Sequence, residues 1–170
     1  VEVEAEYLGL QGKTTAVMVN SDEFTLYQHP SAPLKVCRSV CERFKVDLAN
    51  ARVTDPDQLI KWQQDHPHWS TLRYSELIHK INVDRIVYID LVEYSTHDEP
   101  GNKYQLRGTI MANVSVIEAP GPDGKGGSGD NFAYSTTVRS RFPEDNPVGM
   151  LDADEQMVEY GVLANFSQSV

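Results

Sequence analysis

The sequence predicts an α/β (α+β) fold organised around one mixed five-stranded sheet. Strand-like and helix-like patterns alternate up to residue 82, which is typical of parallel strands joined by helices. Residues 83–94 are the longest run of strand-forming residues and are apolar on both faces, as in a covered central strand. Two alternating stretches follow and indicate an antiparallel meander. The predicted order is β-α-β-α-α-β-β-β-α, with strands arranged 2-1-3-4-5 and helices mainly on one face.

The first elements follow from apolar runs and helix-start signals. Residues 1–12 are expected to form an extended arm, and residues 14–19 a short buried strand. Residues 20–27 are interpreted as a polar turn and a loop. Ser31 and Pro33 start a helix, because serine is a good N-cap and proline suits a first turn. Residues 51–54 are expected to form a brief second strand.

Two helices are predicted before the central strand. Asp55 and Pro56 give a clear helix start, with Gln58 in the position of a capping box. This helix is expected to end near residues 65–67. A further helix is predicted over residues 71–81, and Asn82 ends it.

The central strand carries one anomaly, Asp90. Strict alternation places Tyr88, Asp90 and Tyr94 on one face, and it places Glu93 on the opposite face from Asp90. A carboxylate in so apolar a strand must be paired or protonated. Two interpretations are open: Asp90 is a binding or catalytic group, or a neighbouring side chain satisfies it structurally.

The second half predicts a hairpin and a closing helix. Residues 104–118 alternate, with Gly108 marking a bulge or a close packing point and with one largely solvated face. Residues 119–131 are glycine-rich and are interpreted as a flexible hairpin loop. Residues 132–142 alternate again, residues 143–149 connect, and acidic residues from Asp152 open the last helix.

Composition places the whole chain, residues 1–170, in one domain. The net charge of −10 argues against nucleic acid and against direct binding to an anionic membrane surface. No apolar run approaches the length of a membrane span. The sequence begins at Val1 without a methionine, so we expect a removed segment, for which a signal or lipid-attachment segment upstream of Val1 is a candidate.

The two cysteines, Cys37 and Cys41, lie four residues apart on the first predicted helix. This spacing gives poor disulfide geometry within a helix. Their place in the apolar stripe indicates small core residues. The redox state of the compartment is left open.

No residue cluster in the sequence dictates a chemistry, so no catalytic residue and no cofactor are predicted. His66 and His68, near Asp55 and Asp57, are the nearest approach to a metal site, although their spacing matches no strong zinc pattern. The sequence has no nucleophile elbow and no phosphate-binding loop. A second candidate is an aromatic surface on an open sheet face or edge, whose alternative is packing beneath the helices; its members are Trp69, Tyr88, Tyr94, Tyr104 and Tyr134.

Two segments carry a resemblance to a known group. Asp55 to Leu59 gives the pattern Asp-Pro-x-x-Leu, and Val83 to Val87 gives Val-Asp-x-Ile-Val. With the element order, these resemble the bacterial envelope domains typified by the amino-terminal domain of TolB, the curli-secretion lipoprotein and the lipoprotein activators of penicillin-binding proteins. The resemblance covers residues 13–166. The glycine-rich link and the tract 66–70 depart from the group.

The resemblance implies an extracytoplasmic domain, in the periplasm or attached to the outer membrane, that is often lipid-anchored. It implies contact with envelope proteins and no catalytic residues. Our leading hypothesis is therefore a non-enzymatic interaction domain, the soluble part of a lipoprotein. The alternatives are a small metal-dependent or acid/base enzyme and a small-ligand binding protein.

Overall fold

The computed structural model describes residues 7–48, 50–97, 105–144, 148–149 and 154–170. Its elements, in chain order, are β1 (Thr14–Ser21), α1 (Glu23–Gln28), α2 (Ala32–Asp47), β2 (Arg52–Val53), α3 (Pro56–Asp65), the 3-10 turn η1 (Trp69–Thr71), α4 (Tyr74–Ile81), β3 (Arg85–His97), β4 (Gln105–Glu118), β5 (Tyr134–Phe142), β6 (Val148–Gly149) and α5 (Glu155–Ser169).

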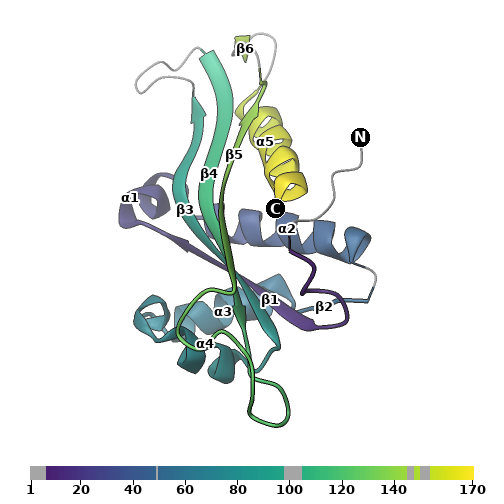
Figure 1. Ribbon diagram of the computed structural model, residues 1–170. Helices are drawn as coiled ribbons and strands as arrows, with labels where there is room; N and C mark the ends of the chain where they lie inside the picture. The colour runs from purple at the N-terminus through teal and green to yellow at the C-terminus, as the bar shows by residue number, and fades with distance from the viewer. Residues whose placement is uncertain (1–6, 49, 98–104, 145–147, 150–153) are drawn as a thin grey trace.

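The sheet has the predicted strand order, β2-β1-β3-β4-β5 (Figure 1). β1 pairs in parallel with both β2 and β3. β3, β4 and β5 form the antiparallel meander. β6, which falls in the expected connector, adds a short antiparallel pairing to β4. β3 therefore joins the parallel half of the sheet to the antiparallel half.

The helix starts follow the sequence signals closely. Asp55 accepts hydrogen bonds from the backbone N–H groups of Asp57 (2.8 Å) and Gln58 (3.3 Å), and Pro56 is the first residue of α3. Asn82 ends α4 in the left-handed conformation at φ 60°, which asparagine tolerates better than most residues. Ser31 is the N-cap of α2, but its side chain makes no capping hydrogen bond.

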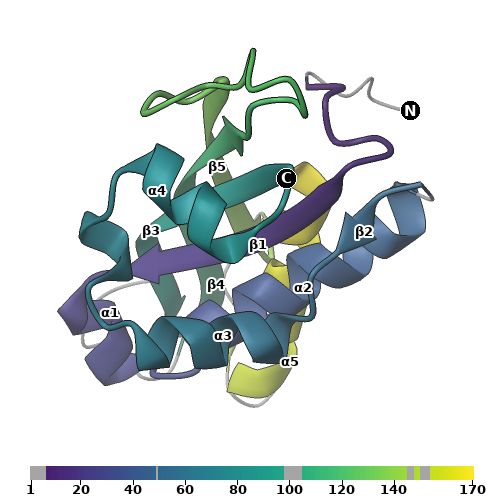
Figure 2. The same ribbon diagram turned by 90° about the horizontal axis from the view of Figure 1, so that it is seen from below.

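The prediction of helices mainly on one face is wrong, because the helices divide between both faces. α2 and α5 pack on one face, against Val17, Val87 and Ile110 among others. α3 and α4 cover part of the other face, against Met18 and Tyr88. Figures 1 and 2 show α2 and α5 together on one side of the strands and α4 on the other. Because helices cover both faces there, β1 and the part of β3 that pairs with it, residues 85–91, are apolar on both faces.

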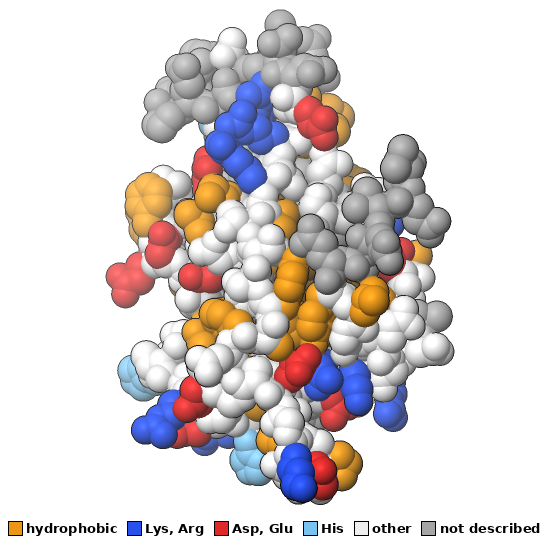
Figure 3. All heavy atoms as spheres, in the orientation of Figure 1, with side chains coloured by type: hydrophobic (Ala, Val, Ile, Leu, Met, Phe, Trp, Pro, Cys, Tyr) orange, Lys and Arg blue, Asp and Glu red, His pale blue; other side chains and the backbone are white. Residues whose placement is uncertain are grey.

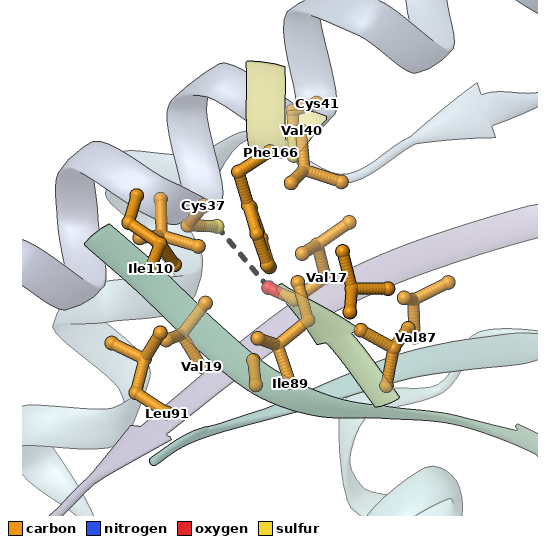
Figure 4. Packing of buried hydrophobic residues seen from close by; sticks show 14 of the residues in the cluster. Val17, Val19, Cys37, Val40, Cys41, Val87, Ile89, Leu91, Ile110 and Phe166 are labelled. Atoms are coloured by element: carbon orange, nitrogen blue, oxygen red, sulfur yellow. Dashed lines mark hydrogen bonds between the residues drawn. The ribbon is translucent and has the colours of Figure 1, made fainter. Parts of the chain in front are cut away.

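The larger core lies between the sheet and helices α2 and α5 (Figure 4). Cys37 and Cys41 are free thiols buried in this core, as predicted, and the Cys37 thiol donates a 3.2 Å hydrogen bond to the Val17 carbonyl. Phe166 of α5 is also fully buried there. Gly108 on β4 is the predicted close packing point, since a methyl group there would lie 2.6 Å from Val162 Cβ.

A bulge interrupts the alternation of β3. Leu91 is opposite Ala112 and Glu93 is opposite Met111, so Val92 is an extra residue without a partner on β4. After it, Tyr94 is opposite Ile110 and joins the core beneath α2 and α5. The expectation that Tyr94 shares a face with Tyr88 is therefore wrong.

Three further segments differ from the expectation or extend it. Residues 23–28, expected as loop, form α1, which Asp22 caps by accepting a 2.7 Å hydrogen bond from Thr25 N–H. Of the expected arm, residues 1–6 lie outside the described residues, and Leu10 is buried in the larger core. The glycine-rich segment joins β4 to β5 and is hydrogen-bonded to the end of β4, from Ser128 N–H to Glu118 O (3.0 Å).

Candidate functional site

The histidine pair has structural contacts at the end of α3. The His66 ring stacks on Trp62, with ring centroids 4.3 Å apart, and its Nδ1 lies 2.8 Å from the Trp62 carbonyl oxygen. The carbonyl of His68 accepts a 2.8 Å hydrogen bond from the Thr71 hydroxyl. Within the described ranges, no group of three His, Cys, Asp or Glu side chains is placed to hold a metal ion.

Asp90 belongs to a row of polar side chains that crosses four strands. The register aligns it with Asn20 on β1 and with Asn113 on β4, and Asn113 is aligned with Thr137 on β5. Asn20 Nδ2 donates a 3.2 Å hydrogen bond to Asp90 Oδ1. Thr137 Oγ1 donates a 2.9 Å hydrogen bond to Asn113 Oδ1. Asp90 is half-buried, so its carboxylate is partnered at a rim where the apolar face ends.

The bulge also corrects the placement of Glu93. Its neighbour Tyr94 points into the larger core, so Glu93 points to the opposite face, which is the face of Asp90. Asp90 and Glu93 are opposite Asn113 and Met111, which are successive positions of that face on β4. The two carboxylates therefore share one side of the sheet.

Trp69 and Tyr88 pack in an aromatic cluster near α4. Their ring centroids lie 5.8 Å apart. Tyr74 extends the cluster, with its ring centroid 5.9 Å from that of Tyr88, and Phe132 packs on Tyr74 at a centroid distance of 4.6 Å. Trp69 and Tyr88 are each 8% exposed. Burial, followed by the nearby charge of Asp90, raises the pKa of Tyr88 to about 12.

The other predicted aromatic residues are elsewhere. Tyr94 lies on the opposite face, where its hydroxyl donates a 2.6 Å hydrogen bond to Glu159 of α5. Burial and this hydrogen bond raise its pKa strongly. Tyr134 packs on Tyr7, with centroids 5.6 Å apart, and Tyr104 lies outside the described residues. The structure thus divides the aromatic set between two faces.

The face of β4 predicted to be largely solvated is polar but only partly exposed. Arg107, Thr109 and Ser115 are buried, whereas Asn113 is exposed. The same face of β5 carries Arg139 and Arg141, opposite Met111 and Thr109. Figure 3 shows basic side chains gathered near one end of the molecule, and a hollow of about 390 Å³ lies beside these two arginines.

An exposed apolar surface surrounds α1, and the sequence interpretation missed it. Phe24 is 68% exposed and Tyr27 is 88% exposed, and three residues apart on a helix they share one side. Val92, the bulge residue, is 50% exposed and lies just beyond Leu91, the partner of the last residue of β1. Figure 3 shows exposed hydrophobic side chains over α1. We call Phe24, Tyr27 and Val92 the α1 surface.

A cavity of about 480 Å³ lies at the carboxyl end of β1. Asn20 and Ser21 of β1, Leu26 of α1, Leu34 of α2, Gln63 of α3 and Trp69 contribute to its wall. Strands and helices far apart in the sequence form this wall, so periodicity alone does not reveal it. The available signal is the change from apolar to polar residues at Asn20, where a buried parallel strand ends.

Two residues that line the cavity each have a buried side-chain oxygen without a hydrogen-bond partner in the part of the chain that the structure describes. The two oxygens are Oε1 of Gln63 and Oγ of Ser21, and both are shielded from solvent. The other end of the Gln63 amide is satisfied, because Nε2 donates a 3.2 Å hydrogen bond to the Val19 carbonyl. A buried acceptor left without a partner is costly, so these atoms mark a place where a donor is missing.

Comparisons with known proteins give a fold and no family. The sequence matches no model of a known protein family and no curated protein at a significant level. The structure is similar to that of the PelC dodecamer from Paraburkholderia phytofirmans, with a TM-score of 0.50, 10% identity, and coverage of 96% of this chain and 91% of that one.

Two lipoproteins give lower scores. Lipoprotein GNA1162 from Neisseria meningitidis has a TM-score of 0.44 and 15% identity, over 92% of this chain and 96% of that one. A minor lipoprotein from Acinetobacter baumannii has a TM-score of 0.43 and 8% identity, over 94% of this chain and 88% of that one. The chain therefore has the overall fold of the PelC subunit.

Proposed function

We propose that this chain is a non-enzymatic interaction domain of a bacterial cell-envelope lipoprotein, and that it contacts a protein partner through the α1 surface. The envelope part of the proposal rests on the resemblance in sequence to envelope lipoprotein domains, together with the strand order that this resemblance shares. In the described ranges no helix is both long and apolar enough to cross a bilayer.

The exposure of the α1 surface is the observation that carries the proposal. Phe24 and Tyr27 present aromatic rings to solvent on a helix that Asp22 holds in place through its cap to Thr25. The bulge adds Val92 beside the start of this helix. Aromatic side chains are enriched at the centres of protein interfaces, and bulges commonly re-aim a side chain at functional positions.

The charges around the α1 surface indicate the chemistry of the partner. Asp22 and Glu23 immediately precede Phe24, and both are exposed. The chain as a whole carries a net charge of −10. A partner segment with an apolar anchor and neighbouring Lys or Arg side chains would complement this surface, and its association rate would fall with added salt.

Site-specific photocrosslinking in the native cell tests the proposal. A benzophenone amino acid replaces Tyr27 in one full-length variant and replaces Val46, which is 75% exposed near the end of α2, in the control. We expect a discrete protein adduct from position 27 that position 46 does not give, and we expect Phe24→Ser to reduce it. No adduct at position 27, or the same adduct from both positions, would refute the docking role.

Fractionation tests the envelope part separately. We expect to recover the full-length protein in the membrane fraction. We also expect it to incorporate an alkyne fatty acid that is supplied during growth. Recovery in the cytosol without label would refute the lipoprotein assignment, whatever the crosslinking result.

A further inference from the structure

We propose that the outer edge of β5 binds an extended segment of a partner protein, which carries acidic residues at alternate positions and adds one strand to the sheet. β5 ends the path β2-β1-β3-β4-β5, and within the described residues only β4 pairs with it (Figure 1). The α1 surface adjoins β1 and β3, and β4 lies between them and β5. The edge of β5 is therefore a second surface, independent of the docking role of α1.

The hydrogen bonds at the end of β4 show which of its residues face β5. Ala119 N–H donates a 2.9 Å bond to the carbonyl of Asp84, which precedes β3. One residue earlier, the Glu118 carbonyl accepts a 3.0 Å bond from Ser128 N–H, in the loop that leads to β5. Backbone groups of successive residues in a strand point to opposite neighbours, so the even-numbered residues of β4 bond to β5.

The same alternation turns the odd-numbered residues of β5 outward. β5 pairs with β4 without a register shift, and even-numbered residues of the two strands are opposite each other. The N–H and C=O groups of Ser135, Thr137 and Arg139 therefore point away from β4. The Arg141 carbonyl follows this rule, since it accepts a 3.3 Å hydrogen bond from Asn165 Nδ2 of α5. Outward backbone groups on an edge strand are a template for one more strand.

The edge of β5 has room for an added strand. A hollow of about 390 Å³ beside it is lined by Arg139, Ser140 and Arg141 of β5 and by Asn165 and Ser169 of α5. β5 contains no proline and no bulge against β4, and these are two devices that protect an edge from pairing. An extended segment can therefore lie along β5 with α5 beside it.

The charge of the edge indicates an acidic partner. Arg139 and Arg141 project from one face of β5, two residues apart, and neither makes an ion pair within the described residues. Glu144 also lines the hollow, which leaves two positive charges against one negative charge. Side chains opposite each other on neighbouring strands are close enough to pair, so acidic residues at alternate positions of the added strand would meet the two arginines.

The same arginines disfavour a second copy of this chain as the occupant. If two β5 strands paired antiparallel over their full length, the Arg139 side chains of the two copies would be diagonal neighbours. Like charges at that range repel, and charged residues on edges prevent self-pairing in this way. The edge therefore discriminates against its own copy and in favour of a segment of opposite charge.

A peptide titration of the full chain, followed by NMR, tests the proposal. The probe is a heptapeptide with blocked ends, Thr-Val-Glu-Thr-Glu-Val-Thr, and the matched comparison has glutamine in place of both glutamates. We expect the peptide to slow hydrogen exchange at the amides of Ser135, Thr137 and Arg139, because these groups gain backbone hydrogen bonds. We expect the glutamine peptide to bind about tenfold more weakly, and added salt to reduce the difference.

Two pairs of substitutions separate the edge from the charge of the whole chain. Arg139→Gln with Arg141→Gln should weaken binding of the acidic peptide about tenfold, since both ion pairs are lost. Arg43→Gln with Lys45→Gln, on α2, makes the same change in net charge and should have no effect. Arg139→Glu with Arg141→Glu should instead prefer a peptide with lysine in place of both glutamates, an exchange of specificity that an unfolded variant could not show.

Thr137→Pro tests the backbone pairing while both arginines remain. Its N–H group points outward, and proline is tolerated at such positions of an edge strand. The substitution should abolish binding of the acidic peptide; if it prevents folding, the arginine variants still decide. Phe24→Ser on the α1 surface should bind the peptide as the parent chain does, so failure of the docking role of α1 would be a separate result.

Three results would overturn the proposal directly: unchanged exchange at the three amides, equal binding of the glutamine peptide, or full affinity in the Arg139→Gln, Arg141→Gln variant. Two others would assign the edge to a different occupant and overturn it too. One is a dimer of the peptide-free chain in sedimentation that Thr137→Pro abolishes. The other is slow exchange at the three amides without peptide that is lost when residues 1–6, which carry alternating glutamates, are removed.

Discussion

The phenol of Tyr94 on β3 donates a 2.6 Å hydrogen bond to Oε1 of Glu159 on α5. The same oxygen accepts a 2.6 Å hydrogen bond from Lys35 Nζ on α2. One carboxylate thus joins the sheet to both helices of the larger core. Burial alone would raise the pKa of Glu159, but the hydrogen bonds from Lys35 and Tyr94 outweigh it and hold the pKa below its usual value of 4.5.

This carboxylate should make the stability of the chain fall in acid. A group whose pKa is lower in the folded state stabilises fully above its unfolded pKa, and the contribution disappears as the pH falls through the folded value. We expect Glu159→Gln to cost about 1–3 kcal/mol at pH 7, as for other hydrogen bonds to charged groups. The difference from the parent chain should shrink below pH 4.5.

Urea unfolding at a series of pH values measures both effects. Tyr94→Phe is the matched control, since it removes one donor and leaves the charge, so it should cost less than Glu159→Gln and keep most of the acid sensitivity. A cost for Glu159→Gln that stays the same from pH 7 to pH 3 would contradict the assignment.

Gly108 should not accept even one methyl group. A Cβ atom there would lie 2.6 Å from Val162 Cβ and 2.9 Å from the Val158 carbonyl oxygen, and backbone cannot move aside as a flexible side chain can. We expect Gly108→Ala to lower the free energy of unfolding by about 1–3 kcal/mol, as overpacking does in other cores. Thermal or urea unfolding provides the measurement.

A double-mutant cycle with Val162→Ala separates overpacking from a change in strand propensity. Val162→Ala alone removes buried methyl groups and should destabilise. The double variant lacks Val162 Cγ1, which would also lie 2.6 Å from the new Cβ, so part of the clash is relieved and the double variant should cost less than the two single variants added together. Simple additivity would show that Val162 Cγ1 does not contribute to the cost of Gly108→Ala.

Cys37 and Cys41 should be inert in the folded chain. The neighbouring Cys41, followed by burial, raises the pKa of the Cys37 thiol, and the thiolate is the reactive form. We expect modification by a disulfide reagent at pH 8 to be more than about 100-fold slower in the folded chain than in denaturant. A Lys45→Cys variant, exposed on the same helix, should react at once at its new thiol. Rapid native modification of Cys37 would contradict the buried placement.

The strand order was predictable because each strand carries its own local signal. Residues 83–94 are apolar on both faces, and the two strands after them alternate, so pairing follows from simple connection rules. The face of the sheet on which each helix packs was not predictable in the same way. The apolar sides of α3 and α4 could pack on either face of the sheet. They pack on the second face because Met18 and Tyr88 project there and need to be buried.

The candidate site was less predictable because its parts are remote in sequence. α1 has six residues, too few for a periodic signal, and its start depends on the single cap at Asp22. The cavity combines residues from β1, α2 and α3, which lie far apart in the sequence, so no local pattern reveals it. The bulge at Val92 also has no turn-forming residue to announce it, and it changes the face of Glu93, Tyr94 and Ser95, up to the second register shift before His97.

Deletion of Val92 should remove the bulge and keep Tyr94 in the larger core. Without the extra residue, Leu91, Glu93 and Tyr94 alternate regularly opposite Ala112, Met111 and Ile110, so the Tyr94–Glu159 hydrogen bond is retained. We expect the deletion to cost less than about 3 kcal/mol, and Val92→Ala, at a 50% exposed position, to cost less than about 1 kcal/mol. Urea unfolding with near-ultraviolet circular dichroism of the tyrosines measures both. A deletion variant that has lost the near-ultraviolet spectrum of the parent would show that the faces of Glu93 and Tyr94 depend on Val92.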